Sequence, residues 1–299
     1  MKMPERSYTC IAALCLLSSM PGCHRVEGNR ADHPRIAAGV SMRDITFHSA
    51  ALNRDMPYRV FLPTQINPGR QLPVIYLLHG GDDGSYLDWS NESDVSRYAA
   101  EGLILVMPEG EFSYYMNAAE KPNERYEDYT FVDLISDVET RFPAARDRDE
   151  RAIVGISMGG YAAIKLALTR PRLFTFVGAF SPSVDIVHRT FKIRRISEWW
   201  RIQTIFGPRD SETRRSRDPF ALVKKADPAQ TPYIYLTSGE TDHLLEPDRQ
   251  FADELSKFHF HYEFHIKPGG HDWTQWDAQI PGCFDSLFRH VKTASLIQH

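Results

Sequence analysis

The stretch RAIVGISMGG, residues 151–160, limits most strongly what this chain can fold into. A short apolar run ends just before Ser157, and its β-branched residues predict a buried strand. The residues after the serine predict a helix. Ser157 therefore falls on a tight turn between a strand and a helix. Gly155 and Gly159 are expected to remove the side chains that would collide where the two elements cross.

Short apolar runs and helical segments alternate along the rest of the chain. The apolar runs predict strands at 44–52, 58–64, 73–80, 103–110, 151–156, 174–182, 233–240 and 261–270. Helices are expected at 93–102, 130–142, 158–170, 247–258 and 275–291. The first two strands show near-alternation of apolar and polar residues, which predicts an antiparallel pair. Later runs are continuously apolar, as in parallel strands covered on both faces. The chain therefore predicts an α/β fold with a mainly parallel central sheet and helices on both faces.

Two local signals refine this reading. Ser93 is expected to be the N-cap of the helix at 93–102, and Gly102 is expected to end it. Residues 183–226 interrupt the alternation and are expected to form a small cap over the site. Residues 186–218 hold eight arginines and one lysine against four acids, with Trp199 and Trp200 in the middle. Such a cap could receive an anionic or aromatic substrate, or contact a membrane surface. The alternative is a solvated layer whose charges pair with nearby acids, and this alternative is favoured.

The N-terminus has the pattern of an export signal. Residues 1–22 start with Lys2 and Arg6, continue with a short apolar run and end in Pro-Gly before Cys23. The apolar run is too short to serve as a membrane-spanning anchor, so it predicts a lipoprotein-type signal peptide with a lipid on Cys23. Plain signal cleavage and a retained anchor stay open. We expect 23–40 to be a tether, 41–299 to be the folded domain, and the protein to be exported to the cell envelope or periplasm.

Composition excludes some partners. The formal net charge of the 299 residues is −4, so nothing global suggests nucleic-acid binding. Of the four cysteines, Cys10 and Cys15 would leave with the signal and Cys23 would carry the lipid. Only Cys283 then remains, so no disulfide framework is expected despite an exported context, and Cys283 is read as a buried apolar residue. The oligomeric state is left open.

Gly-x-Ser-x-Gly between a strand and a helix is the nucleophile-elbow pattern. A serine hydroxyl needs a base to take its proton, and the base is usually a histidine held by a carboxylate. Asp242 and His271 each follow a predicted strand, and the carboxyl ends of parallel strands meet at one edge of the sheet. We therefore expect Ser157, Asp242 and His271 to form a catalytic triad. Glu240, Asp185 and Asp248 are the alternatives for the acid. His243, next to Asp242 in the sequence, is expected to point away from the triad.

Acyl transfer also needs donors for a developing oxyanion. One is expected to be the backbone N–H of Met158, and the other the backbone N–H of Gly81, with Gly80 as second choice. His79 is expected to brace this loop rather than to react. One strand face carries four polar residues spaced by two: His259, His261, Glu263 and His265. A polar, half-exposed strand face is favoured for them over a metal site. No metal and no cofactor is expected.

Several stretches together resemble the esterase D family of α/β-hydrolases, over about residues 44–291. They include PVIYLLHGG, VMPEGEFSYYMN, GISMGGYAAIKLAL, SGETDHL and GGHDWTQW. The resemblance implies an α/β-hydrolase fold, a small-molecule carboxylic ester as substrate, often with an acyl-sugar or aromatic acyl part, and the same triad. It also implies that Tyr114, Tyr115 and Asn117 lie near the substrate. A tryptophan is common in the family at the position of Tyr114.

The leading interpretation is thus a serine carboxylesterase of short-chain, acyl-sugar or aromatic acyl esters. An acyltransferase that moves the acyl group to a sugar is an alternative within the same fold. A catalytically silent envelope binding protein is an alternative from another class, against which an intact triad argues.

Overall fold

The computed structural model describes residues 31–81, 83–190 and 196–292. Outside these residues lie the predicted signal 1–22, residues 23–30 of the predicted tether, with Cys23 among them, and residues 191–195 of the predicted cap. By its contacts the chain divides into Met1–Asp32 and His33–His299, and the fold below is that of the second unit. Among the described residues, no helix is both long enough and apolar enough to cross a membrane.

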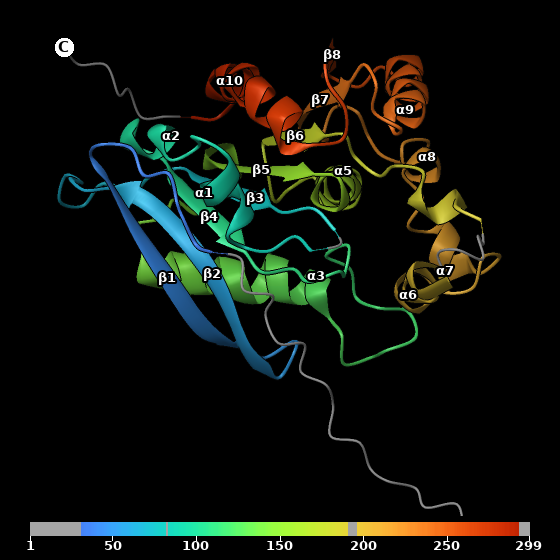
Figure 1. The fold of residues 1–299 in the computed structure, drawn as a ribbon, viewed down its shortest axis with the longest axis horizontal. Helices are drawn as coiled ribbons and strands as arrows, with labels where there is room; N and C mark the ends of the chain where they lie inside the picture. Colours follow the sequence, from blue (N-terminus) through green and yellow to red (C-terminus); the bar gives the residue numbers. More distant parts are fainter. Residues whose placement is uncertain (1–30, 82, 191–195, 293–299) are drawn as a thin grey trace, which may run out of the picture. The chain divides into compact units, whose positions relative to one another are not determined.

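An eight-stranded sheet forms the centre of this unit (Figure 1). In chain order its strands are β1 (Val40–Ser49), β2 (Arg54–Pro63), β3 (Val74–Leu78), β4 (Ile104–Pro108), β5 (Arg151–Ile156), β6 (Phe176–Phe180), β7 (Tyr233–Gly239) and β8 (Tyr262–Lys267). Their spatial order is β1-β2-β4-β3-β5-β6-β7-β8. β1 and β2 pair antiparallel, as does β2 with β4, and all other pairs are parallel. The predicted hairpin and the mainly parallel sheet are confirmed.

Helices cover both faces of the sheet. In β3, Val74, Tyr76 and Leu78 belong to one apolar cluster, whereas Ile75 and Leu77 belong to the other, as the period of two requires. The first cluster includes side chains of α4 (Leu134–Arg141), α5 (Met158–Thr169) and α9 (Leu245–Lys257). The second includes side chains of α1 (Asp88–Glu92), α2 (Arg97–Ala100) and α10 (Trp273–His290). Because both faces are covered, β3, β4, β5 and β6 are buried along their whole length, whereas β8 at the edge of the sheet is partly exposed.

Two helices differ from the prediction. Of the helix expected at 93–102, only the short α2 forms. α1 ends just before this range, and Ser93 is not an N-cap. The Ser93 hydroxyl donates to the Trp89 carbonyl at 2.6 Å and so lies at the end of α1. α1 also holds Trp89, which is fully buried and whose indole N–H donates to the Leu78 carbonyl at 3.1 Å. Gly102 has φ +90° after α2, as expected of a residue that ends a helix.

The helix expected at 130–142 starts earlier than predicted. It runs from α3 (Tyr126–Asp128) through a π-helical turn at Tyr129–Asp133 into α4, and Pro143 follows its end. Cys283 lies on α10 with no exposed surface, as predicted. A Cβ added at Gly178 of β6 would be 2.9 Å from its sulfur, and burial raises the pKa of the thiol well above its usual value.

The cap consists of short elements. A 3₁₀ turn at Ile186–His188 precedes 191–195, and α6 (Ile196–Phe206), α7 (Glu212–Arg215) and α8 (Pro219–Leu222) follow. These three helices lie together beyond α5 (Figure 1). On α6, Phe206 is fully buried and its ring centroid lies 5.2 Å from that of Tyr114 and 5.5 Å from that of Tyr161 on α5. An aromatic cluster thus attaches the cap to the core.

Candidate active site

Ser157 occupies the turn between β5 and α5 with φ 50° and ψ −107°. Such a positive φ is uncommon for a residue with a side chain and marks local strain. The two glycines permit the crossing as predicted. A Cβ at Gly155 would lie 2.3 Å from the carbonyl of Gly159, and a Cβ at Gly159 would lie 2.6 Å from the carbonyl oxygen of Leu78. Glycine is therefore required at both positions to hold the serine here.

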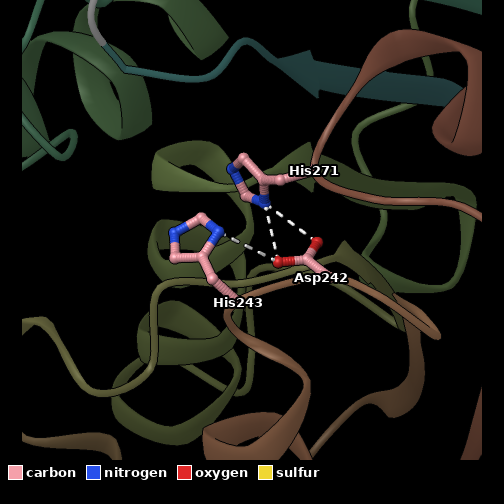
Figure 2. Close-up of side chains that lie close together, drawn as sticks. All are labelled: Asp242, His243 and His271. Carbon is pink, nitrogen blue, oxygen red and sulfur yellow. Dashed lines mark hydrogen bonds and ion pairs between the residues drawn. The ribbon is translucent and has the colours of Figure 1, made fainter.

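The structure brings Ser157, Asp242 and His271 together. The His271 Nε2 atom is 3.0 Å from the Ser157 hydroxyl oxygen. Its other ring nitrogen, Nδ1, is 2.9 Å from Oδ2 and 3.2 Å from Oδ1 of Asp242. Figure 2 shows this edge of the imidazole facing the carboxylate. Asp242 follows β7 and His271 follows β8, so the three groups come from the ends of three strands. One histidine thus bridges a hydroxyl and a carboxylate.

Asp242 lies in an environment that keeps it ionised. Burial raises its pKa, but hydrogen bonds from His271, Ser181 and the Leu244 amide together hold it below its usual value. The Leu244 N–H donates to Oδ1 at 2.8 Å. A charged carboxylate at this position favours the tautomer of His271 that carries its proton on Nδ1. In that tautomer Nε2 has a free electron pair directed at Ser157.

The other candidate acids are not in this contact. Asp185 pairs with Arg189 at 3.3 Å, and Glu240 is exposed. Asp248, on α9, is 1% exposed. Burial raises its pKa well above the usual value, and the negative charges of Asp242 and Asp185 raise it further. Asp248 therefore lies where its protonated form is favoured, and it is not the partner of His271.

His243 was expected to point away from the site, and this prediction is wrong. Its Nδ1 atom lies 3.4 Å from Oδ1 of Asp242, and its ring centroid lies 4.8 Å from that of His271. Figure 2 shows the two imidazoles next to each other, each with a nitrogen facing the Asp242 carboxylate. The tight turn after β7 causes this arrangement, because the Asp242 amide donates back to the Gly239 carbonyl at 3.1 Å and curls the backbone.

Sequence reasoning missed two residues that hold the acid. Ser181, just after β6, has φ 44° and hydrogen-bonds to Asp242. The indole N–H of Trp276 in α10 donates to the Ser181 hydroxyl oxygen at 3.2 Å. The Trp276 ring also lies edge-on to His271, with 5.0 Å between centroids. The position of Ser181 at the end of a buried strand was the signal that could have found it.

The loop after β3 approaches Ser157 as expected. A Cβ at Gly80 would be 3.7 Å from the Ser157 Cβ, and one at Gly81 would be 3.7 Å from the Met158 Cβ. Met158 is the first residue of α5, so its N–H has no carbonyl one turn earlier in the helix. His79 is fully buried: its Nδ1 is 2.7 Å from the Gly80 carbonyl oxygen, and the Gly110 amide donates to Nε2 at 2.8 Å. The expected bracing role of His79 is confirmed.

The three residues expected near the substrate are held by internal contacts. Tyr114 is 4% exposed within the aromatic cluster under the cap. Tyr115 is 1% exposed, with its hydroxyl 3.4 Å from the His79 carbonyl oxygen. The Asn117 side chain donates to Asp128 at 2.9 Å and accepts the amides of Glu127 and Asp128. Contact of these side chains with a substrate stays a prediction.

The known proteins that this chain resembles are esterases and other hydrolases. The family model named Esterase, with the description "Putative esterase", matches residues 49–286. An acetyl esterase of Caldicellulosiruptor saccharolyticus is 26% identical over 263 residues, which are 82% of this chain and 97% of that protein. Esterase Rv1288 of Mycobacterium tuberculosis is also 26% identical, over 254 residues. The alignment covers 75% of this chain and 54% of that esterase.

Solved structures with the same fold include serine hydrolases. The fluorophosphonate-binding serine hydrolase FphF of Staphylococcus aureus matches with a TM-score of 0.73 at 26% identity. The match covers 85% of this chain and 99% of the FphF chain. The S-formylglutathione hydrolase FrmB of the same organism has a TM-score of 0.71 at 25% identity, covering 83% and 98%. The chain therefore belongs to the Esterase family, has the α/β-hydrolase fold and is a serine hydrolase of carboxylic esters.

Proposed function

We propose that Ser157 is the nucleophile of this hydrolase, His271 its general base and Asp242 the acid that orients His271. The observation that supports this most is that His271 bridges the other two groups at 3.0 Å and 2.9 Å. As the Ser157 oxygen attacks the ester carbonyl, its proton passes to Nε2 of His271, and the resulting imidazolium is stabilised by Asp242. The proton then goes to the leaving alcohol, and an acyl-enzyme remains. Water, activated by the same imidazole, releases the acid.

The backbone N–H groups of Met158 and Gly81 are the proposed oxyanion donors. The proximity of Gly81 to Met158 supports this pairing. The bond of His79 to the Gly80 carbonyl supports it further, because that carbonyl and the Gly81 N–H belong to one peptide unit and point in opposite directions. Fixing the carbonyl thus fixes the donor. Preorganised donors of this kind are worth about 10²–10³ in rate each.

Esters with short acyl groups, acetyl first, are the proposed substrates, and acyl-sugar or aromatic acyl esters are the next to test. The acetyl esterase of C. saccharolyticus, aligned over nearly its whole length, supports this order. A screen of acetyl, butyryl and feruloyl esters at equal concentrations ranks these classes by kcat/KM. A second screen adds sugars as acceptors. Acyl transfer would then appear as a sugar ester among the products, whereas hydrolysis gives only the free acid.

The test of the nucleophile is Ser157→Ala, assayed with p-nitrophenyl acetate and a fluorophosphonate probe. Ser183→Ala is the matched control, because Ser183 lies on the same loop system and its amide donates to the Ser157 carbonyl at 3.1 Å. We expect Ser157→Ala to lose hydrolysis and labelling, with an unchanged unfolding midpoint. Equal hydrolysis rates in the wild type and Ser157→Ala would refute the assignment.

We also propose that the protein is exported to the cell envelope and anchored through a lipid on Cys23, as the N-terminal sequence suggests. Metabolic labelling with a radioactive fatty acid tests this. Wild-type chain is expected to carry label and to sediment with membranes, and Cys23→Ala is expected to do neither. Label retained by Cys23→Ala would refute the proposal.

A further inference from the structure

A second histidine beside the proposed acid has no place in the triad. Asp242, His243 and His271 each offer a ligand atom, and these atoms all lie within 4.8 Å of one another. Among the residues that the structure describes, this is the one group of three or more histidine, cysteine or acidic side chains with such spacing. Figure 2 shows the two imidazole nitrogens and the carboxylate oxygens converging.

The separations suit a transition-metal ion. A tetrahedral Zn²⁺ with bonds of about 2.0–2.1 Å places its ligand atoms about 3.3 Å apart. His271 Nδ1 and His243 Nδ1 lie 3.2 Å and 3.4 Å from the same carboxylate oxygen, Oδ1. Closing the gap between the two nitrogens requires a side-chain rotation of His243. Because 65% of the His243 side chain is exposed, that rotation is open to it.

Charge and access also favour a cation here. The Asp242 side chain has no exposed surface, but the His243 side of the cluster opens to solvent and supplies a route of entry. The positive charge of Arg189 acts on His243, and Arg189 itself lies 3.3 Å from Asp185 and 3.8 Å from Glu198. Two carboxylates therefore offset one guanidinium, and the negative charge of Asp242 remains to attract a metal ion.

We propose that Asp242, His243 and His271 form a binding site for a divalent transition-metal ion such as Zn²⁺, and that the bound ion switches the enzyme off. The second half rests on the proposed function. Metal on Nδ1 of His271 requires the electron pair of that nitrogen, so the ring proton moves through solvent from Nδ1 to Nε2. The imidazole stays neutral, but Nε2 now carries a proton and cannot accept one from Ser157. The enzyme is thereby locked in an inactive tautomer.

Isothermal titration with ZnCl₂ tests the site without reference to activity. Four proteins are compared: wild type, Ser157→Ala, His243→Ala and His48→Ala. The last is the control, because His48 is an exposed histidine, 60% against 65% for His243, that also lies beside a carboxylate, that of Asp55. Because loss of even an outer-shell partner weakens metal affinity by about 10- to 100-fold, we expect His243→Ala to bind at least about tenfold more weakly. Wild type, Ser157→Ala and His48→Ala should bind alike, at one ion per chain.

Inhibition is measured in parallel with p-nitrophenyl acetate, each rate being divided by the rate of the same variant without metal. Zinc is expected to inhibit wild type with a midpoint that matches the binding constant, and EDTA is expected to restore the rate. His243→Ala should need at least about tenfold more zinc. Equal zinc affinity in wild type and His243→Ala, or no binding up to millimolar zinc, overturns the site. Binding without inhibition overturns the switch. Zinc binding in a wild type that hydrolyses no ester would refute the proposed function while leaving the metal site intact.

Discussion

The turn that carries Ser157 and the segment beyond α5 that is predicted to be a cap, residues 183–226, are built differently. The turn is specified by the backbone: Gly155 and Gly159 lie where no side chain fits, and all of β5 is buried. The cap is specified by side chains. Arg189 lies between two acids, Arg201 lies 3.7 Å above the Phe112 ring, and Trp200 is 60% exposed. Main-chain packing therefore fixes the turn, whereas polar and aromatic side-chain contacts hold the segment predicted to be a cap. Changes at the turn should therefore affect folding and rate together, and changes on the cap surface should affect neither strongly.

The sharpest way to break this comparison is Gly155→Ala. Its added methyl would lie 2.3 Å from the Gly159 carbonyl, so the strand and helix must separate. We expect a loss of about 3 kcal/mol in the free energy of unfolding by urea. The rate with p-nitrophenyl acetate should fall by at least about 10²-fold, because the reacting groups are displaced. Gly160→Ala is the control, since its Cβ would meet Pro182 at 3.1 Å and a small shift relieves the contact. Equal stability of the two variants would show that the crossing does not need glycine.

His79→Ala extends the comparison to the loop of the proposed oxyanion hole. The variant frees the Gly80 carbonyl, so kcat should fall by roughly 10²-fold while KM changes little. His79→Asn keeps a donor near the position of Nδ1 and should recover part of kcat. A parallel loss in both variants, or a rise in KM alone, would argue that His79 only fills space. Thermal unfolding of each variant separates a rate effect from unfolding.

Asp248→Asn tests the buried acid below the site through pH. The raised folded-state pKa means that the folded chain keeps a proton that the unfolded chain releases above its ordinary pKa. Wild type should therefore lose stability relative to Asp248→Asn as pH rises from that ordinary value toward the folded pKa, by up to about 1.4 kcal/mol per pH unit. Urea unfolding from pH 4 upward measures the difference. Asp253→Asn, at an exposed position on the same helix, should show the same pH dependence of stability as wild type. The same pH dependence in Asp248→Asn and wild type would contradict the prediction.

The smallest effect is expected at the cap surface. Trp200→Ala removes a side chain that is 60% exposed, so the free energy of unfolding should change by less than about 0.5 kcal/mol. Hydrolysis of p-nitrophenyl acetate should stay near the wild-type rate. A large loss in either measurement would show that the cap surface takes part in the fold or the reaction, and the contrast with the turn would fail.

The sheet could be predicted because its signals are local. Each buried strand has its own apolar run, and Ser157, Asp242 and His271 follow strand ends that a parallel sheet brings together. The contacts that were missed depend on the third dimension. Ser93 resembled an N-cap, but its hydroxyl donates to the Trp89 carbonyl at the end of α1. The orientation of His243 depends on how tightly the chain turns after β7, and the link from Trp276 through Ser181 joins residues 95 positions apart.

The position of Trp276 gives the molecule an internal reporter. Its indole ring lies edge-on to His271 at 5.0 Å and is tied through Ser181 to the carboxylate of Asp242. Indole fluorescence is quenched by a neighbouring imidazolium more than by a neutral imidazole. In a variant whose other four tryptophans are changed to phenylalanine, the emission of Trp276 should therefore report the charge that His271 acquires when it takes the Ser157 proton, without any added dye. Acylation of the serine could be watched in the same channel, one turnover at a time, in a stopped-flow instrument.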